Sequence, residues 1–144
     1  MAEAILNAKA KGKFTAYSAG SHPTGTVRPE ALRQIEFAKL PTGGLRSKSW
    51  EEFAQPGAPE MDFVFTVCDD AAAETCPVWP GRPITAHWGV PDPARVSGSP
   101  EQIDAASRNA FMILDRRINL LLCLPLSSLD TLAICKEVDR IGRQ

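Results

Sequence analysis

Two thiols and one carboxyl group within residues 63–94 are the parts of this sequence best suited to chemistry. Cys68 ends the apolar run 63–67, Cys76 follows eight residues later, and Asp92 stands between two prolines. A thiolate can attack an electrophile or another sulfur in a two-electron step. Two thiols beside an acid could therefore reduce a substrate while the thiols become a disulfide.

Cys68 stands at the end of a segment that we expect to be a buried strand. In an open parallel sheet, ligands and reacting groups gather at the carboxyl ends of the strands. The structural alternative is a buried cysteine with no chemical role, because cysteine is among the most often buried residues. Position alone supports the two interpretations about equally.

Cys76 lies in a loop and is followed by a proline. Its spacing from Cys68 is too wide for the close pairs of a zinc knuckle. A disulfide between them needs Cα atoms within about 7 Å, which a bent or partly helical loop allows and a rigid strand does not. His22 and His87 have no partner at ligand spacing, so we expect structural roles for both and no metal site.

Asp92 is held between Pro91 and Pro93. Two prolines stiffen the loop and aim the carboxyl group in one direction, as a general acid requires. The structural alternative is an aspartate that forms a turn, which is common beside proline. Asp92 alone does not decide between the two.

Composition excludes several classes of function. The chain has 144 residues, 44% hydrophobic and 23% charged, with a net charge of −1. This balance gives no reason to expect nucleic acid or an anionic membrane as a partner. The first residues lack an apolar signal core, so we expect a cytoplasmic protein with reduced thiols. Cys123 and Cys135 fall in helical patterns among leucines and isoleucines, where small core residues are expected.

The elements that would position these groups alternate between helix and strand. Pro29 suits the first turn of a helix that could bury Phe37, Ser49 and Glu52 have the spacing of a capping box, and Ser99 precedes a long helix. We expect a single α/β domain over 1–144, with a mainly parallel sheet flanked by helices. The predicted helices cover residues 1–11, 30–40, 99–124 and 130–141, and the predicted strands cover 13–21, 63–67 and 84–90.

Taken together, five segments resemble the arsenate reductases of the low-molecular-weight protein tyrosine phosphatase-like family, of the thioredoxin-coupled type. The resemblance covers nearly the whole chain, and the combination is specific although each piece alone is not. The segments are MAEAIL, YSAGSHPTG, GLRSKSW, DFVFTVCDDAAAETCPVWPG and TAHWGVPDPA.

The resemblance implies a relay of thiols. In such enzymes a cysteine of an N-terminal phosphate loop attacks arsenate, and an aspartate at the Asp92 position protonates the leaving oxygen. A cysteine at the Cys68 position attacks the adduct and releases arsenite. A cysteine at the Cys76 position then completes a Cys68–Cys76 disulfide. The resemblance implies no bound cofactor and an external thiol reductant, thioredoxin, although mycothiol or glutaredoxin would serve the same chemistry.

The sequence departs from this family at its start. The phosphate loop of the family, a cysteine, five residues and an arginine, precedes the first helix, and Met1 falls where that helix begins. We therefore expect an N-terminally incomplete domain that lacks the phosphate loop and the first strand. Without a preorganised anion site we expect this chain to be inactive alone, and the substrate-binding residues are unknown.

Two further functions are compatible with these residues. A non-catalytic redox or thioredoxin-binding relative would keep Cys68 and Cys76 for docking or sensing. A phosphatase-like hydrolase would share the fold, but phosphate-ester hydrolysis uses no thiol relay, so the cysteine pair argues against it. The first alternative would have a native start at Met1, whereas a reductase would continue upstream.

Overall fold

A parallel pair of strands forms the centre of the protein, for which a computed structural model describes residues 1–69, 73–74 and 77–144. β1 (Phe63–Thr66) pairs with β2 (Ile84–His87) in a register that sets Phe63 opposite Ile84 and Thr66 opposite His87. Both strands lie within the segments predicted for them. Their parallel pairing confirms the α/β class.

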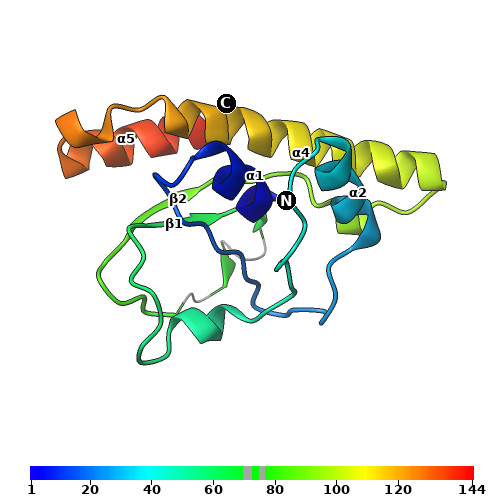
Figure 1. Cartoon of the computed structure of the whole chain (residues 1–144), viewed down its shortest axis with the longest axis horizontal. Helices are drawn as coiled ribbons and strands as arrows, with labels where there is room; N and C mark the ends of the chain where they lie inside the picture. Colours follow the sequence, from blue (N-terminus) through cyan, green and yellow to red (C-terminus); the bar gives the residue numbers. More distant parts are fainter. Residues whose placement is uncertain (70–72, 75–76) are drawn as a thin grey trace.

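The α-helices labelled in Figure 1 gather along one side of these strands. α5 packs on β2, while α1 and α2 pack on α4. The α-helices are α1 (Ala2–Lys9), α2 (Pro29–Phe37), α4 (Pro100–Leu122) and α5 (Thr131–Gly142), and the short 3-10 helices are η1 (Trp50–Phe53), η2 (Pro93–Arg95) and η3 (Leu126–Ser128). None of the helices in the described part of the chain is both long and apolar enough to cross a membrane.

The longest helix, α4, begins as the sequence predicts. The Ser99 hydroxyl accepts from the Gln102 backbone N–H, and the Gln102 side chain accepts from the Ser99 N–H, which completes a capping box. Pro100 occupies the first helical position, where no N–H partner is needed. Four apolar residues at helical spacing on α4 are buried: Ala110, Leu114, Ile118 and Leu121.

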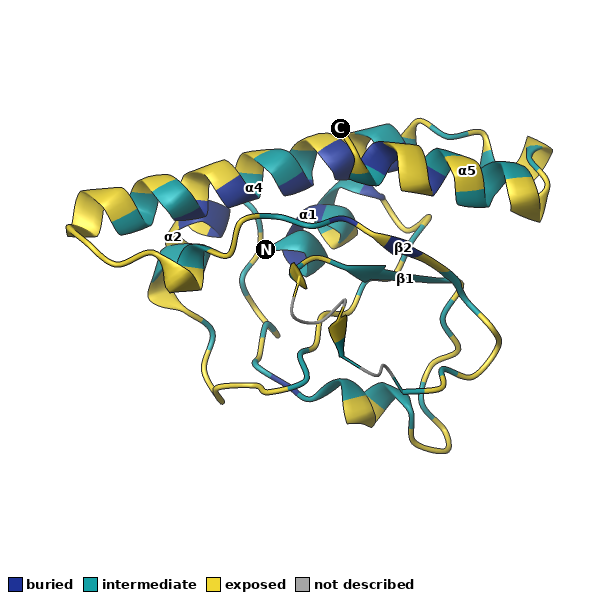
Figure 2. Cartoon of the chain, turned by 180° about the vertical axis from the view of Figure 1, so that it is seen from behind, coloured by how far each residue is buried: buried dark blue, intermediate teal, exposed yellow. Residues whose placement is uncertain are grey.

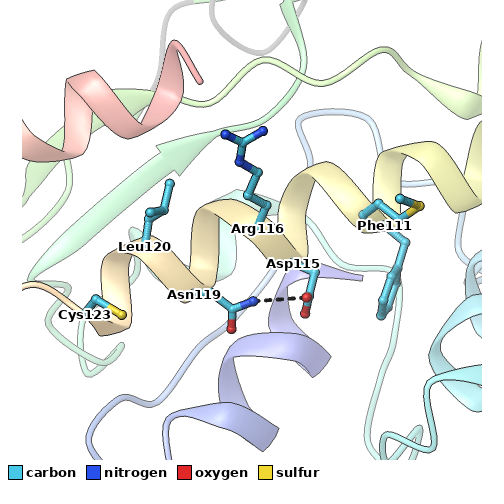
Figure 3. Close-up of a pocket in the computed structure, with 7 residues that line it drawn as sticks. Phe111, Asp115, Arg116, Asn119, Leu120 and Cys123 are labelled. Carbon is cyan, nitrogen blue, oxygen red and sulfur yellow. Dashed lines mark hydrogen bonds between the residues drawn. The ribbon is translucent and has the colours of Figure 1, made fainter.

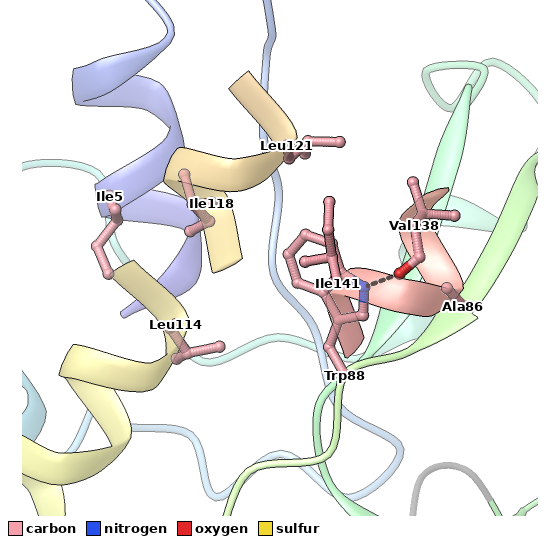
Figure 4. Close-up of a cluster of buried hydrophobic side chains, with 8 residues drawn as sticks. All are labelled: Ile5, Ala86, Trp88, Leu114, Ile118, Leu121, Val138 and Ile141. Atoms are coloured by element: carbon pink, nitrogen blue, oxygen red, sulfur yellow. Dashed lines mark hydrogen bonds between the residues drawn. The ribbon is translucent and has the colours of Figure 1, made fainter. Parts of the chain in front are cut away.

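The core lies between these helices and the two strands (Figure 4). Trp88 is 2% exposed, and its ring stacks on Phe65 with centroids 4.1 Å apart. Its indole N–H donates to the Val138 carbonyl at 2.9 Å, so the only polar atom of the side chain is satisfied. This residue therefore links the sheet to α5 by packing and by a hydrogen bond.

Burial is uneven across the molecule. Figure 2 shows the buried residues on the helix faces that meet the sheet, and a half-buried or exposed loop region on the other side. Among described residues between 36 and 85, Lys48 alone is buried. Its ammonium lies 3.2 Å from a Glu3 carboxylate oxygen, and Ser18 also donates to that carboxylate. One ion pair therefore ties this loop region to α1.

Lys48→Met is expected to lower the free energy of unfolding by about 3–5 kcal/mol, because removing one partner leaves a buried charge uncompensated. The side chains of Lys48 and Glu3 are only 5% and 12% exposed. Urea denaturation measures the change. Arg46→Met is the matched control, since the Arg46–Glu52 pair is exposed and such pairs contribute about 0–1 kcal/mol. Equal losses of stability in Lys48→Met and Arg46→Met would contradict a stabilising role for the buried Lys48–Glu3 pair.

The strand predicted over 13–21 is not present. Residues 14–19 form no ladder with another described segment, and Gly20 forms an isolated bridge with Ser49. The reason is local competition for backbone groups. The Asn7 side-chain amide binds both the N–H and the carbonyl of Ala16, at 2.8 and 3.0 Å, in place of a neighbouring strand.

Two predicted details near the helices are also wrong. Ser49 does cap a short helix, but it accepts from Glu51, while the Glu52 side chain turns away to Arg46 and no capping box forms. Phe37 is 87% exposed. It follows the fully buried Ile35 by two positions, about 200° around the helix, and so lies on the opposite face of α2.

Candidate functional site

The two strands continue to pair beyond their regular ends. The backbone N–H of Trp88 donates to the Thr66 carbonyl at 2.7 Å, and the backbone N–H of Val90 donates to the Val67 carbonyl at 2.8 Å. The segments that follow β1 and β2 therefore leave the sheet at the same edge. Cys68 begins one of these segments, and Asp92 lies in the other.

Cys68 follows β1 directly and is half-buried. The position is the carboxyl end of a parallel strand, as the sequence predicts. Cys76, the second predicted thiol, lies outside the described residues, as does most of the helical turn expected between the two cysteines. The distance between the two sulfur atoms therefore stays a prediction.

Asp92 initiates η2. One of its carboxylate oxygens accepts from the Ala94 N–H at 2.9 Å, and the other lies 3.8 Å from the Arg95 guanidinium nitrogen. These are the contacts of the turn-forming aspartate that the sequence also allowed. The side chain is 40% exposed, so its carboxyl group is accessible to solvent as a general acid must be. The structural role is confirmed, and the chemical role is a prediction.

Arg117 supports the turn that leads to Asp92, which nothing in the sequence pattern predicts. Its guanidinium projects from α4 and donates to the carbonyls of Trp88 and Gly89, at 2.7 and 3.0 Å. Burial lowers the pKa of this group, because a charged form is less stable away from water. The carbonyl contacts offset that cost and hold the turn against α4.

Replacing Arg117 with leucine is expected to destabilise the protein by about 1.5–3 kcal/mol, the range for hydrogen bonds to charged groups. The two carbonyls would lose their donor within a buried environment. Thermal or urea unfolding gives the value. Arg116→Leu is the control, because the neighbouring arginine is exposed. A loss no larger than that of Arg116→Leu would show that Arg117 does not support the turn.

His87 joins the two strand ends through its ring. Its Nδ1 lies 2.8 Å from the Thr66 hydroxyl, and its Nε2 lies 3.1 Å from the Asp69 carboxylate. The sequence suggested a structural histidine because no partner stood at ligand spacing. Its partners come from β1 and from the segment that follows β1, and the register that sets Thr66 opposite His87 brings them within reach.

The two remaining cysteines are less buried than predicted. Cys135 is half-buried, and Cys123 is exposed at the end of α4, two positions after the buried Leu121 and thus on the other side of the helix. Cys123 lines a shallow pocket of about 410 Å³ on the outer side of α4, shown in Figure 3. None of the residues that line this pocket is Cys68, His87 or Asp92, so the pocket is not part of the predicted site.

One cysteine and one arginine do have the spacing of a phosphate loop, namely Cys76 and Arg82. Arg82 and Gly81 both have positive φ values, 53° and 86°, in a turn that leads into β2. A phosphate loop instead leads into a helix, whose first N–H groups bind the anion. Residues 77–82, the part of this segment that the structure describes, lead into β2, so no helix N-terminus accompanies the spacing there. In residues 1–69, 73–74 and 77–144, no three His, Cys, Asp or Glu side chains gather as metal ligands would.

Comparisons with known proteins agree with this architecture. Residues 1–117 match the family of low molecular weight phosphotyrosine protein phosphatases. An arsenate reductase of Shouchella clausii is 46% identical over 71% of this chain and 70% of its own length. Arsenate reductases of Bacillus licheniformis and Halalkalibacterium halodurans are 30% and 28% identical, over 71% and 74% of this chain and 70% and 73% of their own lengths.

Proposed function

Because this chain belongs to the low molecular weight phosphotyrosine protein phosphatase family, we propose that its role is arsenate reduction by a relay of thiols. The relatives named arsenate reductase support this role over ester hydrolysis. We propose further that residues 1–144 act as one domain in the cytoplasm, without a bound cofactor or metal. An external thiol protein of the thioredoxin type would supply the electrons.

The proposed chemistry is a two-electron exchange. A first thiol displaces an oxygen of arsenate, which leaves as water after protonation by Asp92, and a sulfur–arsenic bond forms. The Cys68 thiolate attacks that sulfur, so that a disulfide forms and the bonding pair stays on arsenic, which leaves as arsenite. Cys76 then attacks Cys68, releases the first thiol and completes a Cys68–Cys76 disulfide. The reductant returns both cysteines to thiols.

One observation supports this assignment most strongly. Cys68 and Asp92 follow neighbouring parallel strands whose pairing extends to Val67 and Val90, so the thiol and the acid leave the sheet at one edge. Reacting groups in open parallel sheets gather at this edge. Asp92 is held in its turn by the Ala94 N–H, and Arg117 fixes the preceding turn to α4.

The first thiol of the relay is not among residues 1–67, which contain no cysteine. Residues 77–82, the described part of the segment with phosphate-loop spacing, lead into β2 and not into a helix whose N-terminus could bind an anion. We therefore expect the 144-residue chain alone to release no arsenite from arsenate, even with a complete reducing system.

The function is tested with a chimera of this chain. We would place a strand and a phosphate loop, with its cysteine and arginine, ahead of α1 and add arsenate, thioredoxin, thioredoxin reductase and NADPH. Arsenate-dependent NADPH oxidation with stoichiometric arsenite is the expected result. The same protein with serine for the loop cysteine is the control. Hydrolysis of aryl phosphate without arsenite release would identify a phosphatase, and neither activity would favour a redox module.

A further inference from the structure

We propose that His87 is a positioning residue that clamps the turn carrying Cys68 to the end of β2. The inference rests on the proposed function only for its consequence, the placement of the thiol for exchange. Its geometry stands independently. The imidazole contacts Thr66 on one side of Cys68 and Asp69 on the other, at 2.8 and 3.1 Å. Along the chain, Cys68 thus lies between two residues that the same imidazole ring contacts.

The hydrogen bonds assign a role to each ring nitrogen. An ionised carboxylate only accepts, so the Nε2 that faces Asp69 carries the proton. In the neutral ring the Nδ1 then accepts, and the Thr66 hydroxyl is its donor. Thr66 belongs to β1 and is already fixed by the sheet. The Thr66 contact therefore orients the ring, and the Asp69 contact restrains the turn.

The space around Gly89 provides a second observation. A Cβ atom on Gly89 would lie 2.6 Å from the His87 Nε2 and 3.1 Å from the Asp69 carboxylate oxygen. The first of these distances is far below van der Waals contact. The absence of a side chain at Gly89 therefore leaves the space in which the two groups meet. Gly89 does not have a positive φ, so sterics and not backbone conformation require glycine here.

A clamp of this kind would control how often the Cys68 thiol is exposed. Cys68 is half-buried, while the Asp69 side chain is 93% exposed. Among the described residues, the hydrogen bond between the His87 ring and the Asp69 carboxylate is the side-chain contact that joins Asp69 to β2. Without it the turn would open more often, because local opening follows the number of contacts that restrain a segment. We expect the clamp to keep the thiol in place between exchange steps.

The test measures how fast each cysteine reacts with iodoacetamide in the reduced 144-residue chain, resolved by peptide mass spectrometry. We expect His87→Asn to raise the rate at Cys68 roughly fivefold, about what the loss of one net hydrogen bond predicts. The amide of asparagine reaches the Nδ1 position and contacts Thr66 alone. His87→Gln places its amide nitrogen at the Nε2 position, contacts Asp69, and should keep the parent rate.

Gly89→Ala should also raise the Cys68 rate, since its methyl group enters the space between the ring and the carboxylate. Gly43→Ala is its control, because no atom lies within 4 Å of the added Cβ and φ is not positive there. The rate at the half-buried Cys135, on α5, reports general loosening, and the exposed Cys123 serves as the reference for an accessible thiol. A higher rate at Cys68 alone supports the clamp.

Three outcomes would overturn the proposal: an unchanged Cys68 rate in His87→Asn, equal rates in the asparagine and glutamine variants, or a parallel rise at Cys68 and Cys135. None of these readouts involves arsenate. If His87→Asn raises the Cys68 rate and the chimera with a phosphate loop releases no arsenite, this inference stands and the proposed function fails. If the chimera releases arsenite and the Cys68 rate is unchanged in His87→Asn, the proposed function stands and this inference fails.

Discussion

Cys68→Ser is expected to abolish the disulfide that thioredoxin reduces in this chain. The proposed final product of the relay is a Cys68–Cys76 disulfide, and serine cannot form the sulfur–sulfur bond. We would oxidise the purified chain with diamide, remove the oxidant, and follow NADPH oxidation by thioredoxin and thioredoxin reductase. The parent chain should consume one equivalent of NADPH, and the variant should consume almost none. Cys76→Ser should behave in the same way.

The chain contains its own matched controls for this experiment. Cys123 and Cys135 lie on α4 and near the middle of α5, away from the end of β1. Serine at either position should leave the NADPH equivalent unchanged. Full reduction capacity in Cys68→Ser, or its loss in Cys123→Ser, would show that the exchanging pair has been assigned to the wrong cysteines.

Trp88→Ala is expected to lower the free energy of unfolding by about 3–5 kcal/mol, the usual cost of removing a large buried aromatic side chain. The ring fills the space between β1 and α5, stacked on Phe65, and its N–H satisfies the Val138 carbonyl. The substitution would leave a cavity and an unpaired carbonyl. A domain of this size has about 5–15 kcal/mol to lose, so urea denaturation should show a large fall in the midpoint.

Two companion variants separate the causes of that loss. Trp88→Phe keeps most of the packing and removes the hydrogen bond, so a loss of about 1–3 kcal/mol is expected. Phe37→Ala removes an aromatic ring that is 87% exposed and should change stability by no more than about 0.5 kcal/mol. A small effect of Trp88→Ala, comparable to that of Phe37→Ala, would contradict the placement of Trp88 in the core.

Local signals were sufficient for the elements whose stability is local. Ser99, Pro100 and Gln102 predict where α4 begins, because a capping box and a first-turn proline act within four consecutive residues. The apolar run of β1 and the proline at the start of α2 predict their elements for the same reason. The turn-forming alternative for Asp92 is confirmed, since the partner of its carboxylate is Ala94, two residues away.

Errors arose where distant groups compete for the same atoms. Residues 14–19 have the composition of a strand, but the Asn7 side chain takes the backbone groups of Ala16. Glu52 has the spacing of a capping residue, but the Arg46 guanidinium is the stronger partner for its carboxylate and lowers the pKa of Glu52. A pattern within one segment contains no information about such competitors.

The sequence by itself determined the class of fold and the family resemblance, and it proposed the thiols and the acid, because these depend on residue types and short spacings. The tertiary structure alone decided which groups surround them. His87 meets Thr66 only through the strand register, and Arg117 meets the Trp88 and Gly89 carbonyls only because α4 packs against that turn. Side-chain contacts between distant segments depend on the relative placement of whole elements, which the packing of the core fixes and no local pattern encodes.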